Sequence, residues 1–214
     1  MKLLWAAFAI AALLMPARPA LAEEPDEGKS ADSLLVRVRG LGIMPDTSSS
    51  ISAIHGQVHV SDTVAPEVDA SYFLTDGFAI ETIVTTTRHR VVARGTVLGD
   101  VDAGTVRLLA PTVIAQWHFM PHAAFSPYVG AGATYSWFFD PAAPGGLVNK
   151  IAYSRALGGA IEAGADYNVT GRWFLNFDVK RLFFQTTVKI DGGAIRAETN
   201  VRPTIVGAGI GYRF

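Results

Sequence analysis

Charged residues recur at alternate positions in several segments of this chain, and that spacing places their side chains on one face of a β-strand. The residues concerned are Arg37, Arg39, Glu67, Asp69, Glu81, Glu162, Asp166, Asp178, Lys180 and Arg213. Groups of opposite charge that are crowded into a narrow, partly dehydrated space must pair with one another. The chemistry that this pattern predicts is a network of ion pairs.

Groups that could support catalysis or bind a metal are poorly organised. His122 and Ser126 are close in sequence, but no third triad member is evident and there is no G-x-S-x-G motif. His55 and His59 lie in a predicted long loop and are only a weak signal for a metal site. The sequence therefore predicts no enzyme, no metal site and no cofactor.

The elements that carry the charges alternate apolar with polar or small residues, as strands with two different environments do. The closing segment Pro203–Phe214 is typical: Thr204, Val206 and their alternate neighbours are apolar or lipid-tolerant, and glycines lie between them. Eight such segments are predicted, at 34–44, 64–75, 78–90, 107–119, 126–139, 152–167, 172–186 and 203–214. This pattern predicts an all-β fold, an eight-stranded antiparallel transmembrane β-barrel.

The connections between the segments alternate in length. The short ones, rich in turn-forming residues, are 75–77, 120–125 and 168–171. The long ones are 45–63, 91–106, 140–151 and 187–202. Outer-membrane barrels have short periplasmic turns and long extracellular loops, so both chain ends are expected in the periplasm. Turn candidates inside two long loops, His55-Gly56 and Asp191-Gly192-Gly193, predict hairpin extensions.

Aromatic residues on the apolar face fall into two bands. Near the short turns they are Tyr72, Phe78, Trp117, Phe119, Tyr167, Trp173, Tyr212 and Phe214, and near the long loops Trp137, Phe139, Tyr153 and Phe183. Two aromatic belts around an aliphatic zone indicate a face that contacts lipid. The rival architecture, a soluble barrel with this face turned inward, would overfill an eight-stranded interior.

The start of the chain predicts export. Lys2, an apolar stretch from Leu3 to Met15 and Ala20-Leu21-Ala22 match a secretory signal peptide, residues 1–22. A short periplasmic leader, 23–33, and a barrel, 34–214, would follow. The signal peptide contains two of the 18 basic residues and none of the 19 acidic ones, so the mature charge is −3. Without a basic patch, nucleic acid is not an expected partner, and without cysteine there are no disulfides.

The lumen face changes character along the barrel. The charged residues lie toward the short turns, where a structural plug is a better explanation than an ion path. Toward the long loops the same face is apolar, with Leu41, Ile43, Leu108, Phe138, Leu182, Phe184 and Ile205. This apolar lumen would either hold a small hydrophobic molecule or pack the barrel against its own loops.

Several ordered segments resemble the outer-membrane protein W (OmpW) family of Gram-negative bacteria. They include Val36-Arg37-Val38-Arg39-Gly40, Pro66-Glu67-Val68-Asp69, Thr85-Thr86-Thr87-Arg88-His89, Gln116-Trp117-His118-Phe119, Phe125-Ser126-Pro127-Tyr128-Val129 and Gly207-Ala208-Gly209-Ile210-Gly211-Tyr212-Arg213-Phe214. The resemblance implies an outer-membrane barrel whose hydrophobic lumen admits small apolar molecules and releases them sideways through its wall.

The expected function is therefore passage of small hydrophobic molecules into or across the outer membrane by a monomer whose other partners are membrane lipids. The alternative is a structural or surface-interaction barrel without transport, whose loops contact cells, phage or polysaccharide. Eight strands leave no aqueous channel, so bulk porin activity is not expected.

Overall fold

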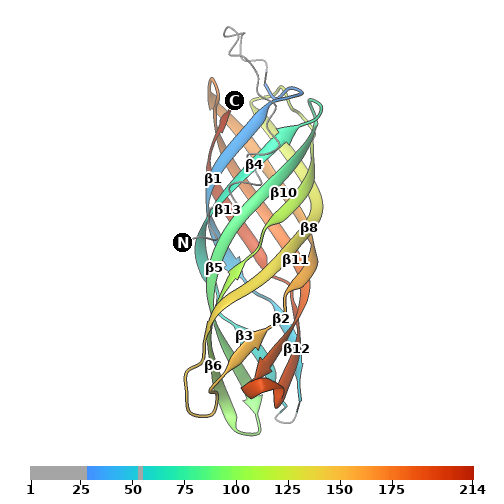
Figure 1. Cartoon of the computed structure of the whole chain (residues 1–214). Coiled ribbons are helices and arrows are strands. Elements are labelled where there is room, and N and C mark those ends of the chain that lie inside the picture. The colour runs from blue at the N-terminus through green and yellow to red at the C-terminus, as the bar shows by residue number, and fades with distance from the viewer. Residues whose placement is uncertain (1–27, 53–54) are drawn as a thin grey trace.

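A computed structural model of the protein describes residues 28–52 and 55–214, which are nearly all strand (Figure 1). The predicted signal peptide and most of the predicted leader lie outside this described part. The elements are β1 (Leu34–Met44), β2 (Thr47–Ile51), β3 (Gln57–Val60), β4 (Thr63–Phe73), β5 (Phe78–Thr96), β6 (Gly99–Leu109), β7 (Thr112–His118), β8 (Phe125–Ala142), β9 (Ile151–Tyr153), β10 (Ala156–Thr170), β11 (Trp173–Ile190), the short 3-10 turn η1 (Asp191–Gly193), β12 (Ile195–Val201) and β13 (Thr204–Arg213). Across these residues, no helix is long and apolar enough to cross a bilayer.

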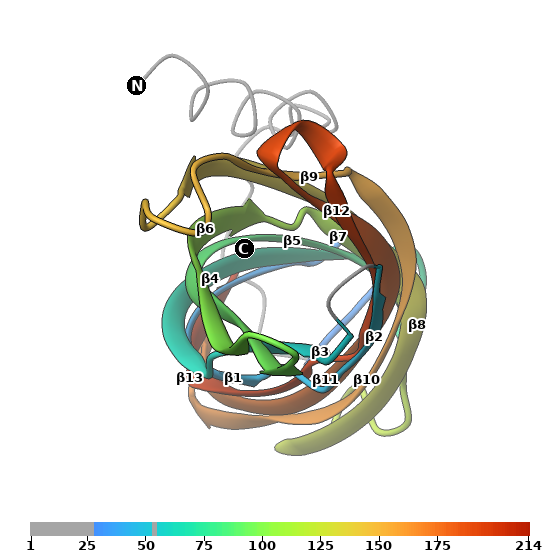
Figure 2. The same ribbon diagram turned by 90° about the horizontal axis from the view of Figure 1, so that it is seen from below.

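Eight of the strands close into an antiparallel ring. Its order is β1-β4-β5-β7-β8-β10-β11-β13, and β13 pairs back with β1. Figure 2 shows this ring along its axis. Because the ring is closed, none of its strands has an unpaired edge. In hydrocarbon, the unpaired backbone N–H and C=O groups of such an edge would cost several kcal/mol each. The predicted eight-stranded barrel is confirmed.

The barrel continues beyond the ring at the end opposite the short turns, here called the loop end. β5 runs on to Thr96 and pairs there with β6 and β3, and β11 runs on to Ile190 and pairs with β12 and β9. These extensions occupy much of the predicted long loops and form the lower part of the barrel in Figure 1. The hairpin extension expected at Asp191-Gly192-Gly193 is present, because β11 and β12 pair on either side of that turn. The strands on either side of His55-Gly56 differ from the expectation: β2 pairs with β12, and β3 pairs with β5.

The strands have the inside-out burial that the alternation predicts. Outward-facing Val38, Phe177 and Ile210 are each more than half exposed, whereas inward-facing Arg37 and Arg39 are almost completely buried. Apolar side chains that face outward over the whole ring suit a hydrocarbon environment, and polar ones can then occupy only the lumen.

Two predicted strands are interrupted. The segment predicted at 107–119 is divided at Ala110 and Pro111, because proline has no N–H to donate to the sheet. The segment predicted at 152–167 is divided at Ser154 and Arg155. After this second break, the alternate positions that face lipid are no longer those counted from β10. The prediction that Tyr153 lies in the lipid-facing belt is therefore wrong. Its ring lies inside the barrel and stacks on Phe138, with 5.2 Å between the ring centroids.

Candidate functional site: a charged layer and an apolar lumen

The first half of the lumen, at the short-turn end, contains the predicted charge network. Strands β1 and β4 pair Arg37 with Asp69 and Arg39 with Glu67 directly across from each other. Arg37 Nε donates to Asp69 Oδ1 at 2.5 Å, and Arg39 Nη2 lies 2.9 Å from Glu67 Oε1. Both guanidinium groups also donate to one oxygen of Glu81 on β5, at 2.7 and 2.8 Å. The register of three adjacent strands thus sets the pairing.

The opposite wall completes this network. Lys180 on β11 donates to Glu67 Oε1 at 2.9 Å and to Asp178 Oδ2 at 2.5 Å. Arg39 Nη1 lies 3.3 Å from Asp178 Oδ1. All four side chains are almost fully buried, so the ion pairs cross the lumen and fill it with paired charge. Buried charges are tolerated only when they are paired and hydrogen-bonded in this way.

A second set of contacts lies nearer the short turns. Lys29 Nζ is 2.8 Å from Asp166 Oδ2, and the Asn176 amide donates to Asp166 Oδ1 at 2.7 Å. The Gln116 amide donates to Glu162 Oε1 at 2.5 Å. We call the complete set the charged layer: Lys29, Arg37, Arg39, Glu67, Asp69, Glu81, Glu162, Asp166, Asp178 and Lys180.

Some residues of this region were not predicted. Lys29 precedes the first strand, so the alternation within strands does not identify it. Burial lowers the pKa of its ammonium group.

Tyr128 was not predicted either. It is nearly fully buried, and its ring centroid lies 5.7 Å from the Arg37 guanidinium carbon. Its lumen parity could have identified it. Room for this ring comes from Gly164, where a Cβ would be 2.5 Å from the Tyr128 hydroxyl. Arg213 is half-buried at the edge and donates to the Gly28 carbonyl.

The second half of the lumen is apolar. All seven residues predicted for the apolar lumen come together in one cluster: Leu41, Ile43, Leu182, Phe184 and Ile205 are buried in it, and Leu108 and Phe138 pack against it. The cluster borders a cavity of about 70 Å³. One water molecule needs roughly 10–15 Å³ by this kind of measure, so the space is several times larger. We call it the inner cavity.

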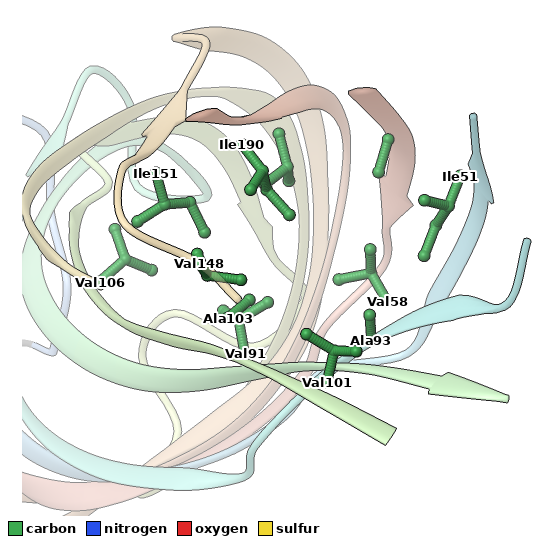
Figure 3. Packing of buried hydrophobic residues seen from close by; sticks show 12 residues of the cluster. Ile51, Val58, Val91, Ala93, Val101, Ala103, Val106, Val148, Ile151 and Ile190 are labelled. Carbon is green, nitrogen blue, oxygen red and sulfur yellow. The ribbon is translucent and has the colours of Figure 1, made fainter. Parts of the chain in front are cut away.

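A second cavity of about 70 Å³ lies farther toward the loop end, and we call it the outer cavity. Most of its wall belongs to a second apolar cluster, in which side chains come together from β2, β3, β5, β6, β9, β11 and β12 and from the connection between β8 and β9 (Figure 3). Val58, Val91 and Val188 line both cavities. The two spaces are therefore neighbours with a shared apolar boundary.

The wall beside the inner cavity contains the proline break. Ala110 lines the cavity, and Pro111 follows it between β6 and β7. The chain is held here by two backbone hydrogen bonds, from Ala110 to the Thr85 carbonyl at 3.3 Å and from Tyr135 to the Pro111 carbonyl at 2.9 Å. Regular pairing between the flanking strands resumes at Leu109 and Thr112.

The histidines are also placed. His122 Nε2 lies 3.3 Å from Asp76 Oδ2, and Ser126 Oγ is 3.5 Å from His118 Nδ1, so the two residues weighed as a catalytic pair make different contacts. Within the described ranges, no group of three or more His, Cys, Asp or Glu residues could hold a metal ion.

Sequence comparisons place this architecture among known proteins. A sequence model of the OmpW family matches residues 30–214. The uncharacterized outer-membrane protein y4mB of Sinorhizobium fredii is 39% identical over 183 residues, which cover 84% of this chain and 79% of that protein. Outer membrane protein W of Escherichia coli is 33% identical over 153 residues, or 67% of this chain and 70% of that protein.

Solved structures agree on the fold. The crystal structure of the outer membrane protein OprG from Pseudomonas aeruginosa superposes with a TM-score of 0.82 at 24% identity, covering 88% of this chain and 98% of that one. The family match spans almost all of the described residues, including the strands that carry the charged layer and the apolar lumen. The chain therefore belongs to the OmpW family of outer-membrane proteins.

Proposed function

We propose that this barrel passes small hydrophobic molecules from outside the cell into the outer membrane, with entry at the loop end and exit sideways through the wall. The observation that carries the proposal is the junction of the two apolar cavities with the charged layer. A hydrophobic molecule could occupy the first region and would be rejected by the second.

The entry side is supported by the lining of the cavities. The surface that faces each cavity is almost wholly apolar, which is expected for a site that holds an apolar ligand, although four threonines and His89 are among the residues around the inner cavity. Water finds few hydrogen-bond partners in such a space. Each methylene group of a ligand, in contrast, lowers the free energy by about 0.8 kcal/mol when it moves from water into an apolar site.

The periplasmic side is closed to such a ligand. Arg39 contacts carboxylates from β4, β5 and β11, so a molecule that continued along the axis would have to separate several buried ion pairs. Breaking one buried pair costs about 3–5 kcal/mol. An exit through the wall avoids that cost.

The proline break is the proposed exit. It borders the inner cavity at Ala110, and Pro111 cannot donate a hydrogen bond to the sheet. Opening the wall here would disturb fewer backbone hydrogen bonds than opening it along a regular strand pair.

The first experiment tests the apolar lumen. Phe184→Asp places a charge in the inner cavity, and Val97→Asp places one at an exposed position in the connection between β5 and β6. We expect Phe184→Asp to lose most protein-dependent uptake of N-phenyl-1-naphthylamine by vesicles with lipopolysaccharide in their outer leaflet, while Val97→Asp retains it. Heat-modifiable gel mobility reports whether each variant folds. Normal uptake by folded Phe184→Asp would contradict the proposal.

The second experiment tests the exit. The native chain has no cysteine, so a disulfide between Ala110→Cys and Ser136→Cys would lock the wall across the break. The control disulfide joins Val113→Cys and Ala133→Cys, which pair directly on the neighbouring regular strands. We expect oxidation to slow uptake only in the first variant, and reduction to restore it. Equal uptake before and after oxidation would contradict a lateral exit here, and no uptake by the native protein would favour a structural or surface-interaction role.

A further inference from the structure

Two arginines lie side by side on the outer wall of the barrel, where the ring continues into the loop-end extensions. Arg88 on β5 and Arg107 on β6 are direct cross-strand partners. Both side chains are exposed, whereas their sequence neighbours His89 and Val106 line the inner cavity, so the two guanidinium groups are on the outer face. Directly opposite residues have Cβ atoms about 4.5–5.5 Å apart, and like charges at such positions destabilise a sheet.

Carboxylates do little to neutralise this pair. Arg107 Nε lies 3.5 Å from Asp140 Oδ2, and both side chains are at least half exposed, so the contact is weak. Arg88 Nη2 donates to the neutral Thr105 hydroxyl at 3.2 Å, and within residues 28–52 and 55–214 it forms no ion pair. The Asp102 carboxylate on β6 contacts Arg90 instead. The Arg88–Arg107 pair can therefore attract an anion from outside the barrel.

The pair lies at the depth of the aromatic belt of the loop end. Arg107 is directly opposite Phe139 on β8, and Trp137 is two residues from Phe139 toward the short turns. A third arginine, Arg155, has its guanidinium carbon 5.1 Å from the centroid of the Trp137 ring. Because the rings of such a belt lie among lipid headgroups, the three arginines face the headgroups of the outer leaflet.

The aromatic belt at the short-turn end has a different surrounding. The direct cross-strand partners of Trp117 are Phe78 on β5 and Val129 on β8. On these strands a guanidinium accompanies the belt at the loop end and an apolar side chain accompanies it at the other end. The difference matches the two leaflets of an outer membrane, of which the outer one contains phosphorylated glycolipid.

Arg155 is separated from the pair by one strand. β8 pairs with β6 on one side and with β10 on the other, and Arg155 immediately precedes β10. Neighbouring strands are about 4.8 Å apart, so Arg155 is roughly 10 Å from Arg107 across the wall. One molecule with two separated phosphate groups can therefore contact the pair with one phosphate and Arg155 with the other.

The wall below the arginines suits hydrocarbon chains. Val113, Ala133 and Gly159 are direct neighbours across β7, β8 and β10, and all three are exposed on the outer face. No atom lies within 4 Å of a Cβ built at Gly159. These short side chains form a shallow strip on which an acyl chain can lie close to the backbone.

We propose that Arg88, Arg107 and Arg155 form a binding site on the outer wall for the phosphate groups of an outer-leaflet glycolipid of the lipid A type. Arginine suits this role because its planar guanidinium can donate two parallel hydrogen bonds to one phosphate. A bound phosphate would also remove the repulsion between Arg88 and Arg107. The site lies outside the lumen, so it goes beyond the proposed function and does not depend on it.

The test uses the full barrel refolded without lipopolysaccharide in micelles of dodecylmaltoside, a detergent that has no phosphate. The probes are bisphosphoryl lipid A, monophosphoryl lipid A, phosphatidylglycerol and inorganic phosphate, and binding is followed by NMR of the arginine Nε–H groups. The test variant is Arg88→Gln with Arg107→Gln. The matched control is Lys189→Gln with Arg196→Gln, because these two exposed cations are also direct cross-strand partners, on the β11–β12 hairpin.

We expect bisphosphoryl lipid A to bind most tightly. The test variant should lose affinity for it at least roughly tenfold, the effect of losing charge-assisted hydrogen bonds, and the control should stay close to native. Arg155→Gln should reduce the preference for bisphosphoryl over monophosphoryl lipid A. Equal losses in the test variant and the control would overturn the inference. Phosphatidylglycerol or inorganic phosphate binding as tightly as lipid A would also overturn it.

A second measurement separates a binding role from a structural one. Because Arg88 and Arg107 repel each other, Arg88→Gln without lipid A should unfold at a temperature close to or above that of the native barrel. Added bisphosphoryl lipid A should raise the unfolding temperature of the native barrel more than that of Arg88→Gln. Clear destabilisation of Arg88→Gln without lipid A, or an equal rise in both proteins, would contradict the proposed site.

Discussion

Lys29 Nζ lies 2.8 Å from Asp166 Oδ2 at the periplasmic end of the lumen, with both side chains buried. Lys29 comes from the short leader before the first strand and Asp166 from β10. The contact ties a segment outside the barrel strands into the charged layer, and a backbone hydrogen bond of 3.0 Å from Lys29 to Pro121 holds it further. The described part of the leader, from residue 28, is therefore a structural part of the closed end.

Replacing this lysine should release the leader and leave the barrel closed. In Lys29→Met, Asp166 keeps the Asn176 amide at 2.7 Å and Arg37 at 3.5 Å, so the rest of the layer persists. The charge-assisted hydrogen bond that is lost stabilises the leader by about 1.5–3 kcal/mol. We therefore expect the backbone amide at position 29 to exchange its hydrogen at least roughly tenfold faster. Hydrogen exchange by NMR measures this, and exposed Lys150→Met is the control. Unchanged exchange would show that the leader is held in another way.

Removing the Arg39 guanidinium should lower the stability of the whole barrel. Its guanidinium lies within 3.3 Å of four carboxylates, those of Glu67, Asp69, Glu81 and Asp178. Arg39→Met leaves them buried with fewer cations, and we expect a loss of about 3–5 kcal/mol in the free energy of unfolding. Urea unfolding in lipid vesicles measures it, and Arg39→Lys, which keeps the charge, should lose less.

The control for Arg39 is Arg181, whose pair with Asp46 at 3.2 Å is partly exposed to solvent. Such pairs contribute about 0–1 kcal/mol, so Arg181→Met should be close to native stability. Similar losses in Arg39→Met and Arg181→Met would mean that burial does not set the importance of these ion pairs.

Glycines in the strands should differ sharply in their tolerance of a methyl group. At Gly209 on β13, a Cβ would collide with the backbone of Val38 and Arg39, whereas no atom lies within 4 Å of a Cβ built at Gly40. We expect Gly209→Ala to lower the temperature at which the heat-modified gel band appears, and Gly40→Ala to leave it unchanged. The same shift in both variants would contradict a steric origin.

The hairpin beyond the membrane contains an ion pair whose pH dependence can be predicted. Arg90 donates to Asp102 Oδ2 at 2.5 Å, and this bond, followed by one from the Gly104 backbone, lowers the pKa of Asp102 below its ordinary 3.8. A lowered pKa means that the pair stabilises the hairpin above about pH 3.8, and that this contribution disappears as the pH falls through the Asp102 pKa in the folded protein.

A carbon-detected NMR titration of the Asp102 carboxyl measures this shift. Arg90→Gln should raise the Asp102 pKa toward 3.8 without fully restoring it, because the Gly104 bond remains. Arg94→Gln on the same hairpin is the control for a general charge effect. If both variants moved the pKa equally, the direct contact would not be its cause.

Much of the fold could be predicted from alternation alone. The lumen parity identified Arg37, Arg39 and Glu67 because a strand has only two faces, and a charge cannot lie on the one that contacts lipid. Lys29 could not be found in this way, since it lies outside any strand and its position depends on how the chain folds back into the lumen.

Tyr153 shows the limit of the same rule. Counting alternate positions from Arg155 onward places Tyr153 on the lipid side, but the break at Ser154 and Arg155 reverses its direction. Strand breaks depend on pairing with distant segments, here β11, and a single sequence does not reveal that pairing. The apolar lumen was predicted as a set of residues, but its two cavities were not.

The charged layer also has a consequence for how the barrel is assembled. The first and last strands meet only when the barrel closes, with Arg39 opposite Gly209. A slip of β1 by one residue would turn Arg37 and Arg39 toward hydrocarbon, where each arginine costs about 2–4 kcal/mol at the bilayer centre, and would leave their carboxylates without them. Closure in a register shifted by one residue therefore costs free energy on both faces of the wall. The charged layer forms completely only when β1 and β13 pair in the native register.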